Sequence, residues 1–200
     1  MNRILTFTFV SLLIACKPSS QNKYELLNKD DAFRAEISTR TKGSFVELSE
    51  GYTYYREANK NSQKSTVILV HGFSVPSYIW ENTYGALIEN GFHVVVLDLY
   101  GRGFSDNPDT DYTDRLMANQ VLELINHLNI SQAHLVGLSN GGRIISQAAV
   151  LQPQLIQSLI YVSSNSFEDI EATKDVSVST DEIAEFISRY PAIALGQLDD

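Results

Sequence analysis

The stretch that decides the fold is HLVGLSNGGRII, which runs from His134 to Ile145. An apolar, strand-like run precedes Ser139, and a helix-like run follows it. Gly137, Ser139 and Gly141 spell G-x-S-x-G, the spacing of a strand-to-helix turn that holds a nucleophile clear of a sheet. The alternative is a structural glycine turn whose serine only caps the helix. The strand, turn and helix context favours a nucleophile at Ser139.

Short apolar runs alternate with helix-like segments on both sides of this turn. Two runs rich in aromatic and β-branched residues predict a hairpin, at 44–48 and 52–57. Continuous apolar runs predict buried strands, at 65–70, 93–99, 134–138 and 159–164. Helical patterns are found at 77–90, 111–128 and 140–152. Such alternation predicts an α/β fold with right-handed crossovers and a mainly parallel sheet that has helices on both faces.

Unusual residues follow three of the predicted buried strands. The loops read HGF after the first strand, DLYGRGFSDNP after the second and GLSNGG after the third. In a parallel sheet, binding and catalytic sites lie beyond the carboxyl ends of the strands. The site is therefore expected to be built from these three loops.

At these loops the sequence resembles the α/β-hydrolase superfamily, from Phe45 through Ser163. The matching motifs are HG, D-x-x-G-x-G-x-S and the nucleophile elbow. The residues of the first two motifs are His71 and Gly72, then Asp98, Gly101, Gly103 and Ser105. The resemblance implies an α/β-hydrolase fold, of which residues 44–166 would form the N-terminal part of the core.

The GxSxGG elbow is most similar to that of monomeric esterases and lipases, so the resemblance implies a serine hydrolase of carboxylic esters. C–C bond hydrolases share this pattern and remain an alternative. A serine rather than an aspartate at the elbow argues against a haloalkane dehalogenase or an epoxide hydrolase. The expected partner is a small-molecule ester substrate.

Hydrolysis by a serine proceeds through an acyl-enzyme and a tetrahedral intermediate, whose oxyanion needs hydrogen-bond donors. The resemblance implies that the main-chain N–H groups of Phe73 and Asn140 are these donors. Structural roles are expected for the other motif residues, which are His71, Gly72, Asp98, Gly137 and Gly141. His71 is expected to brace the oxyanion loop rather than to act as the base. No metal or organic cofactor is expected, because a base, an oxyanion hole and water suffice.

The catalytic acid and base are missing from the motifs. In this fold the triad follows the chain order serine, acid, histidine, yet all four histidines precede Ser139: His71, His93, His127 and His134. Residues 167–200 resemble the beginning of a helical cap, and the final core strands are expected beyond them. Two hypotheses follow: a hydrolase whose given chain is cut short, or a non-catalytic remnant or binding protein with this fold. The 200-residue chain itself is expected to be inactive.

The first residues are typical of an exported protein. Residues 1–15 have a basic residue and then an apolar run that is too short to span a bilayer, so they are interpreted as a signal peptide. Cys16 follows Ala15 as in the lipobox of bacterial lipoproteins, and a lipid anchor on the extracytoplasmic face of a bacterial membrane is expected. The alternative is a plain signal peptide with a chance cysteine. Residues 16–43 are interpreted as a tether and lead-in.

The composition and charge of the chain argue against a nucleic-acid partner and an internal disulfide. The chain is 44% hydrophobic, which is ordinary for a globular protein, and its net charge is −9 with a pI of about 4.9. Such a charge repels a phosphate backbone, so no nucleic-acid partner is expected. Cys16 is the only cysteine, which rules out an internal disulfide.

Overall fold

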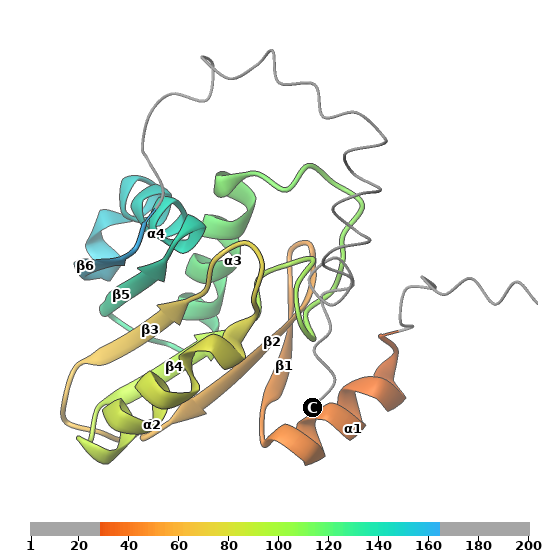
Figure 1. Cartoon of the computed structure of the whole chain (residues 1–200), viewed down its shortest axis with the longest axis horizontal. Coiled ribbons are helices and arrows are strands. Elements are labelled where there is room, and N and C mark those ends of the chain that lie inside the picture. Colours follow the sequence, from red (N-terminus) through yellow and green to blue (C-terminus); the bar gives the residue numbers. More distant parts are fainter. Residues whose placement is uncertain (1–28, 165–200) are drawn as a thin grey trace, which may run out of the picture.

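The computed structural model of this chain describes residues 29–164 (Figure 1). Six strands form one sheet in the order β1-β2-β4-β3-β5-β6. The strands are β1 (Ser44–Leu48), β2 (Gly51–Ala58), β3 (Thr66–Val70), β4 (His93–Leu97), β5 (Ala133–Leu138) and β6 (Ile156–Val162). The pairs β1–β2 and β2–β4 are antiparallel, and the other pairs are parallel. The predicted hairpin and the predicted, mainly parallel sheet are confirmed.

Helices cover both faces of the sheet (Figure 1). α2 (Glu81–Glu89) covers one face, and α3 (Asp114–His127) and α4 (Asn140–Leu151) cover the other. The remaining helix, α1 (Asp31–Thr41), lies beside β1, and two short 3₁₀ turns are η1 (Ser77–Trp80) and η2 (Pro153–Leu155). Successive strand residues point to opposite faces. Ile68 therefore joins the core under α3 and α4, whereas Leu69 packs with Trp80 and Tyr84 under η1 and α2. Burial on both faces explains why β3 and β4 are continuously apolar.

Helix α1 lies within residues 16–43, which the sequence predicts to be a tether and lead-in. Asp30 caps it by accepting a hydrogen bond from the Phe33 N–H at 2.9 Å. Only Ile37 of this helix is buried, so the helix shows no apolar stripe that a sequence pattern could reveal. Its start is held instead by Lys29, whose Nζ lies 3.0 Å from the Gly103 carbonyl oxygen.

Element boundaries shift slightly from the predicted ones. The helix predicted from residue 77 begins as η1, α3 begins at Asp114 after its cap Thr113, and β6 begins at Ile156. The predicted signal peptide, Cys16 and the predicted cap at 167–200 lie outside the described residues. Within residues 29–164 no helix has the length and apolar character needed to cross a bilayer.

Candidate active site

Ser139 stands at a sharp turn between β5 and α4. Its backbone has φ 51° and ψ −121°, a conformation that costs a non-glycine residue about 1–3 kcal/mol. The Ser139 N–H donates to the Val162 carbonyl oxygen at 2.9 Å, and the Ser139 carbonyl accepts from the Gly142 N–H at 3.0 Å. The strand-to-helix turn expected from G-x-S-x-G is thus present, and main-chain bonds hold its strained residue.

The two other residues of this motif stand where backbones approach closely. A Cβ on Gly137 would lie 2.5 Å from the Gly141 carbonyl oxygen, and one on Gly141 would lie 2.5 Å from the Val70 carbonyl oxygen. Real side chains do not fit at such distances. The start of α4 can therefore pack against β3 and β5 only because both positions are glycine.

His71 follows β3 and is fully buried. Its Nε2 lies 2.9 Å from the Leu99 nitrogen, and its Nδ1 lies 2.7 Å from the Gly72 carbonyl oxygen. A main-chain N–H can only donate, so Nε2 accepts and Nδ1 carries the proton that it donates to Gly72. Burial lowers the pKa of His71, which favours this neutral form. With both ring nitrogens occupied, His71 cannot take a proton from Ser139.

The same bond orients a candidate oxyanion donor. The Gly72 carbonyl and the Phe73 N–H belong to one trans peptide unit and point in opposite directions. By holding the carbonyl, His71 therefore sets the direction of the Phe73 N–H. A Cβ on Gly72 would lie 3.0 Å from the Ser139 Cβ, so this peptide unit lies beside the elbow.

Asn140 supplies the second candidate donor. It is the first residue of α4, and the N–H groups of a first helical turn have no partner within the helix. The positive end of the helix dipole adds to the attraction for an anion at this point. The N–H groups of Phe73 and Asn140, from two different elements, are therefore the two candidate donors beside the elbow.

Asp98 follows β4 and joins two of the loops. It is buried, and its Oδ1 accepts from the Ser77 N–H while its Oδ2 accepts from the Phe104 N–H, both at 2.8 Å. Ser105 Oγ donates to the Asp98 carbonyl oxygen at 2.6 Å. Because main-chain donors from two loops satisfy both carboxylate oxygens, Asp98 connects these loops.

The other three histidines lie away from Ser139. His93 begins β4, with Nδ1 2.8 Å from Thr66 Oγ1 and Nε2 2.9 Å from Glu57 Oε1. His134, near the start of β5, bonds to Ser158 Oγ at 2.7 Å, and His127 ends α3. These positions belong to the edge at which the parallel strands begin, whereas Ser139 follows a strand end. In the part of the chain that the structure describes, no histidine is placed to act as its base.

Arg102 is the site residue that sequence reasoning missed. Its Nε donates to the Phe73 carbonyl oxygen at 2.5 Å, and its guanidinium carbon lies 4.4 Å from the centroid of the Phe73 ring. In the sequence, the feature that could have indicated Arg102 is its position between Gly101 and Gly103, the two glycines of D-x-x-G-x-G-x-S. In the structure, both of these glycines have positive φ.

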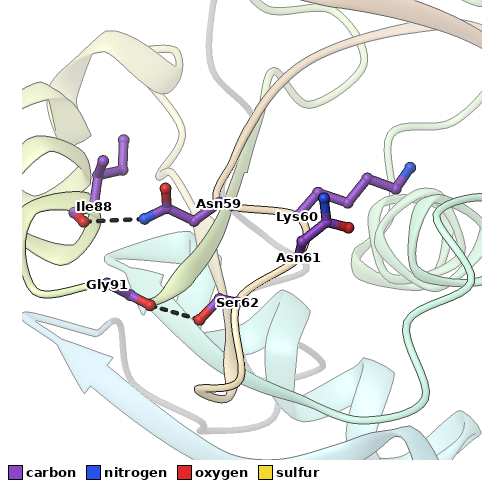
Figure 2. A pocket seen from close by; sticks show the side chains of 6 residues that line it. All are labelled: Asn59, Lys60, Asn61, Ser62, Ile88 and Gly91. Atoms are coloured by element: carbon purple, nitrogen blue, oxygen red, sulfur yellow. Dashed lines mark hydrogen bonds between the residues drawn. The ribbon is translucent and has the colours of Figure 1, made fainter.

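An open hollow of about 470 Å³ lies elsewhere, beside the loop before β3 and the end of α2 (Figure 2). Asn59 Nδ2 donates to the Ile88 carbonyl oxygen at 3.0 Å, and Ser62 Oγ donates to that of Gly91 at 2.6 Å. These groups cap the end of α2 and are not free to bind a ligand. Among the described residues no cluster of three or more His, Cys, Asp or Glu is placed to hold a metal ion; the expected lack of a cofactor stays a prediction.

Comparisons with known proteins support the fold. The family model described as alpha/beta hydrolase fold matches residues 65–189. YugF of Bacillus subtilis (strain 168), an uncharacterized hydrolase, is 30% identical over 119 residues, which are 59% of this chain and 43% of that protein. The soluble epoxide hydrolase of Corynebacterium sp. (strain C12) is 34% identical over 93 residues, or 46% and 32% of the two chains.

Among solved structures, the esterase EaEST from Exiguobacterium antarcticum matches with a TM-score of 0.60 at 23% identity. The match covers 74% of this chain and 56% of that one, and it supports the fold. The chain spans less than half the length of the two curated relatives above.

Proposed function

The chain belongs to the α/β-hydrolase fold family, and we propose that it carries the nucleophile and the oxyanion hole of a serine hydrolase that cleaves carboxylic esters. The observation that carries the proposal is the strained Ser139, set between β5 and α4 and packed against the Gly72–Phe73 peptide unit.

The proposed reaction begins when Ser139 Oγ attacks the ester carbonyl carbon. The serine proton passes to a base, the Oγ–carbon bond forms, and an electron pair moves onto the carbonyl oxygen. The N–H groups of Phe73 and Asn140 then stabilise that oxyanion, an effect for which a single donor is worth about 10²–10³ in rate. Collapse of the intermediate expels the alcohol together with a proton. Water next attacks the acyl-enzyme, releases the carboxylic acid and restores Ser139.

The proposal favours esters over epoxides despite the likeness to an epoxide hydrolase. Epoxide hydrolases of this superfamily attack with an elbow aspartate, whereas this chain has Ser139. No described residue favours a C–C bond as the substrate. The proposal also needs a general base, and none of the four histidines is suitable. A base from residues outside the described range is therefore part of the proposal.

The test uses a fluorophosphonate probe, which bonds covalently to an activated serine. Free imidazole is added as a soluble base, so that a missing histidine does not hide the nucleophile. We expect imidazole to accelerate labelling, and we expect Ser139→Ala to abolish it. Ser146→Ala is the matched control, because Ser146 lies on α4 and donates to the Gly142 carbonyl. Labelling that survives Ser139→Ala, or a folded protein that is not labelled even with imidazole, would overturn the proposal.

We also propose, from the sequence, that Cys16 is lipid-modified and holds the protein on the extracytoplasmic face of a bacterial membrane. Each buried acyl CH₂ contributes about 0.8 kcal/mol, so several chains outweigh the repulsion from a net negative protein. Cys16→Ser should release the protein from the membrane fraction. A variant that still sediments with membranes would contradict the anchor.

A further inference from the structure

We propose that Arg102 is a positioning residue for acyl transfer, because it holds Phe73 of the oxyanion loop by both its carbonyl group and its ring. The inference rests on the proposed function. Arg102 lies in the turn after β4, where Gly101 has φ +72° and Gly103 has φ +50°. Two left-handed glycines on either side of one residue make a tight turn, and this turn directs Arg102 toward the loop that follows β3.

The contacts of Arg102 are specific. Nε donates to the Phe73 carbonyl oxygen at 2.5 Å, and Nη1 donates to the Gly101 carbonyl oxygen at 2.9 Å. The guanidinium also lies over the Phe73 ring, 4.4 Å from its centroid. One planar side chain thus ties its own turn to the main chain and the side chain of Phe73. A lysine has one ammonium and no plane, so it could not make all three contacts.

Phe73 needs such a support because the protein core does not provide one. Phe73 is 63% exposed. The loop is anchored before Phe73 by His71, which bonds to the Gly72 carbonyl, and after it by Asp98, which accepts from the Ser77 N–H. Among the described residues, Arg102 makes the one side-chain hydrogen bond to the main chain between these two anchors.

The two bonds on either side of the Phe73 Cα act together. His71 holds the peptide unit that carries the Phe73 N–H, and Arg102 holds the next peptide unit through the Phe73 carbonyl. Peptide units are planar, so holding both of them restricts φ and ψ of Phe73. Without Arg102 the second unit can rotate, and the donor N–H loses part of its fixed direction.

The charge of Arg102 supports the same role. Burial lowers the pKa of Arg102, although an arginine stays protonated at neutral pH. No carboxylate forms a salt bridge with it in the described part of the chain. A positive charge next to the oxyanion loop favours the negative charge that develops during acyl transfer.

The experiment compares Arg102→Met and Arg102→Lys with Arg34→Met. Arg34 is the matched control, because it also stacks on an aromatic ring, at 3.8 Å from the Tyr52 centroid, and donates to a main-chain carbonyl, that of Lys29. The first readout is the NMR order parameter of the Phe73 N–H. We expect it to fall from about 0.85 toward 0.6 in Arg102→Met and to stay unchanged in Arg34→Met.

The second readout is Ser139-dependent labelling by the fluorophosphonate probe with imidazole. In Arg102→Met the maximal rate should fall about 10- to 100-fold, while the half-saturating probe concentration stays within about two-fold. Arg102→Lys should recover part of that rate. If Arg102→Met does not fold, Arg102→Lys alone tests the inference. It should lower both the Phe73 order parameter and the maximal labelling rate, by less than is expected for Arg102→Met.

Two results separate the inference from the function on which it rests. If labelling depends on Ser139 but the Arg102 variants match Arg34→Met in both readouts, the inference is wrong and the proposed function stands. If no variant is labelled at Ser139, the proposed function is wrong, and the order parameter of Phe73 still decides whether Arg102 positions the loop.

Discussion

Gly72 lies so close to Ser139 that a Cβ on the glycine would stand 3.0 Å from the serine Cβ and 3.1 Å from the Leu138 carbonyl oxygen. The closeness follows from strand pairing. β3 and β5 are neighbouring parallel strands with Val70 opposite Gly137, so the residues that follow them leave the sheet side by side. The pairing of β3 with β5 thus brings the candidate nucleophile and the candidate oxyanion loop together.

Gly72→Ala should damage the site more than the overall fold. The added methyl group meets a main-chain oxygen, so either the loop or Ser139 must shift by a few tenths of an ångström. We expect a loss of about 1–3 kcal/mol of unfolding free energy and a fall in imidazole-assisted labelling of Ser139 of about tenfold or more. Wild-type labelling in Gly72→Ala would show that the spacing of these loops is not critical.

Alanine substitutions at two other glycines should change the stability of the protein in opposite directions. A Cβ on Gly141 would lie 2.5 Å from the Val70 carbonyl oxygen and 2.7 Å from that of His71, whereas a Cβ on Gly85 in α2 meets nothing within 4 Å. Gly141→Ala should therefore lower the unfolding free energy by about 3 kcal/mol. Gly85→Ala should raise it by about 0.5–1 kcal/mol through helix propensity. Urea unfolding measures the change in unfolding free energy of each variant. Changes of the same sign in the two variants would contradict the packing argument.

The parts of the fold that the sequence predicted are those with a local cause. The strands around Ile68 and Val95 are buried on both faces, so the whole run must be apolar. The elbow was visible because glycine is the one residue that fits where backbones nearly touch, as at Gly137 and Gly141. In both cases the physical requirement lies within a few consecutive residues.

Other features depend on residues that are distant in sequence, and no local pattern revealed them. Helix α1 buries only Ile37 and is held by Lys29 against a loop more than 70 residues later. Arg102 gains its role from Phe73, in another loop. The proton position on His71 follows from its bond to Leu99. These features require the tertiary structure.

The backbone strain at Ser139 should be measurable as a difference in unfolding free energy between two variants at this position. Alanine keeps a Cβ at φ 51° and thus keeps the strain, whereas glycine releases it. We expect Ser139→Gly to be more stable than Ser139→Ala by about 1 kcal/mol. At Ser146, inside α4, the order should reverse, because alanine is favoured over glycine within a helix by about 1 kcal/mol. Equal stability of the two Ser139 variants would mean that the turn is unstrained.

His71 should make the protein less stable in mild acid. Because burial lowers the pKa of His71 in the folded state, the unfolded chain, with a histidine pKa of about 6.5, binds a proton that the folded protein does not. The contribution of His71 to the unfolding free energy is therefore fully present above about pH 6.5. As the pH falls below that value, the contribution decreases by up to about 1.4 kcal/mol per pH unit. The unfolding free energy, measured with urea between pH 5 and 7.5, should change less steeply with pH in His71→Asn than in the wild type.

Equal slopes in that comparison would contradict a buried neutral histidine. Because His71→Asn also loses bonds to Gly72 and Leu99, it will be less stable at every pH, and only the slope is compared. NMR of the wild-type imidazole gives a second measurement. Its ring should remain neutral, with the proton on Nδ1, at pH values where an exposed histidine is charged.

A polypeptide of residues 16–200 should be a poor esterase. No histidine follows Ser139, and both ring nitrogens of His71 are bonded to the main chain. A serine hydroxyl without a base is a weak nucleophile, so the oxyanion hole alone should leave a rate of about 10³-fold over water or less. Hydrolysis of short-chain p-nitrophenyl esters, compared with Ser139→Ala, measures this, and imidazole should raise only the Ser139-dependent part. Ser139-dependent turnover of about 1 per second or faster would contradict the prediction, and Glu168 and Asp169 would then be the first candidates for the unassigned base.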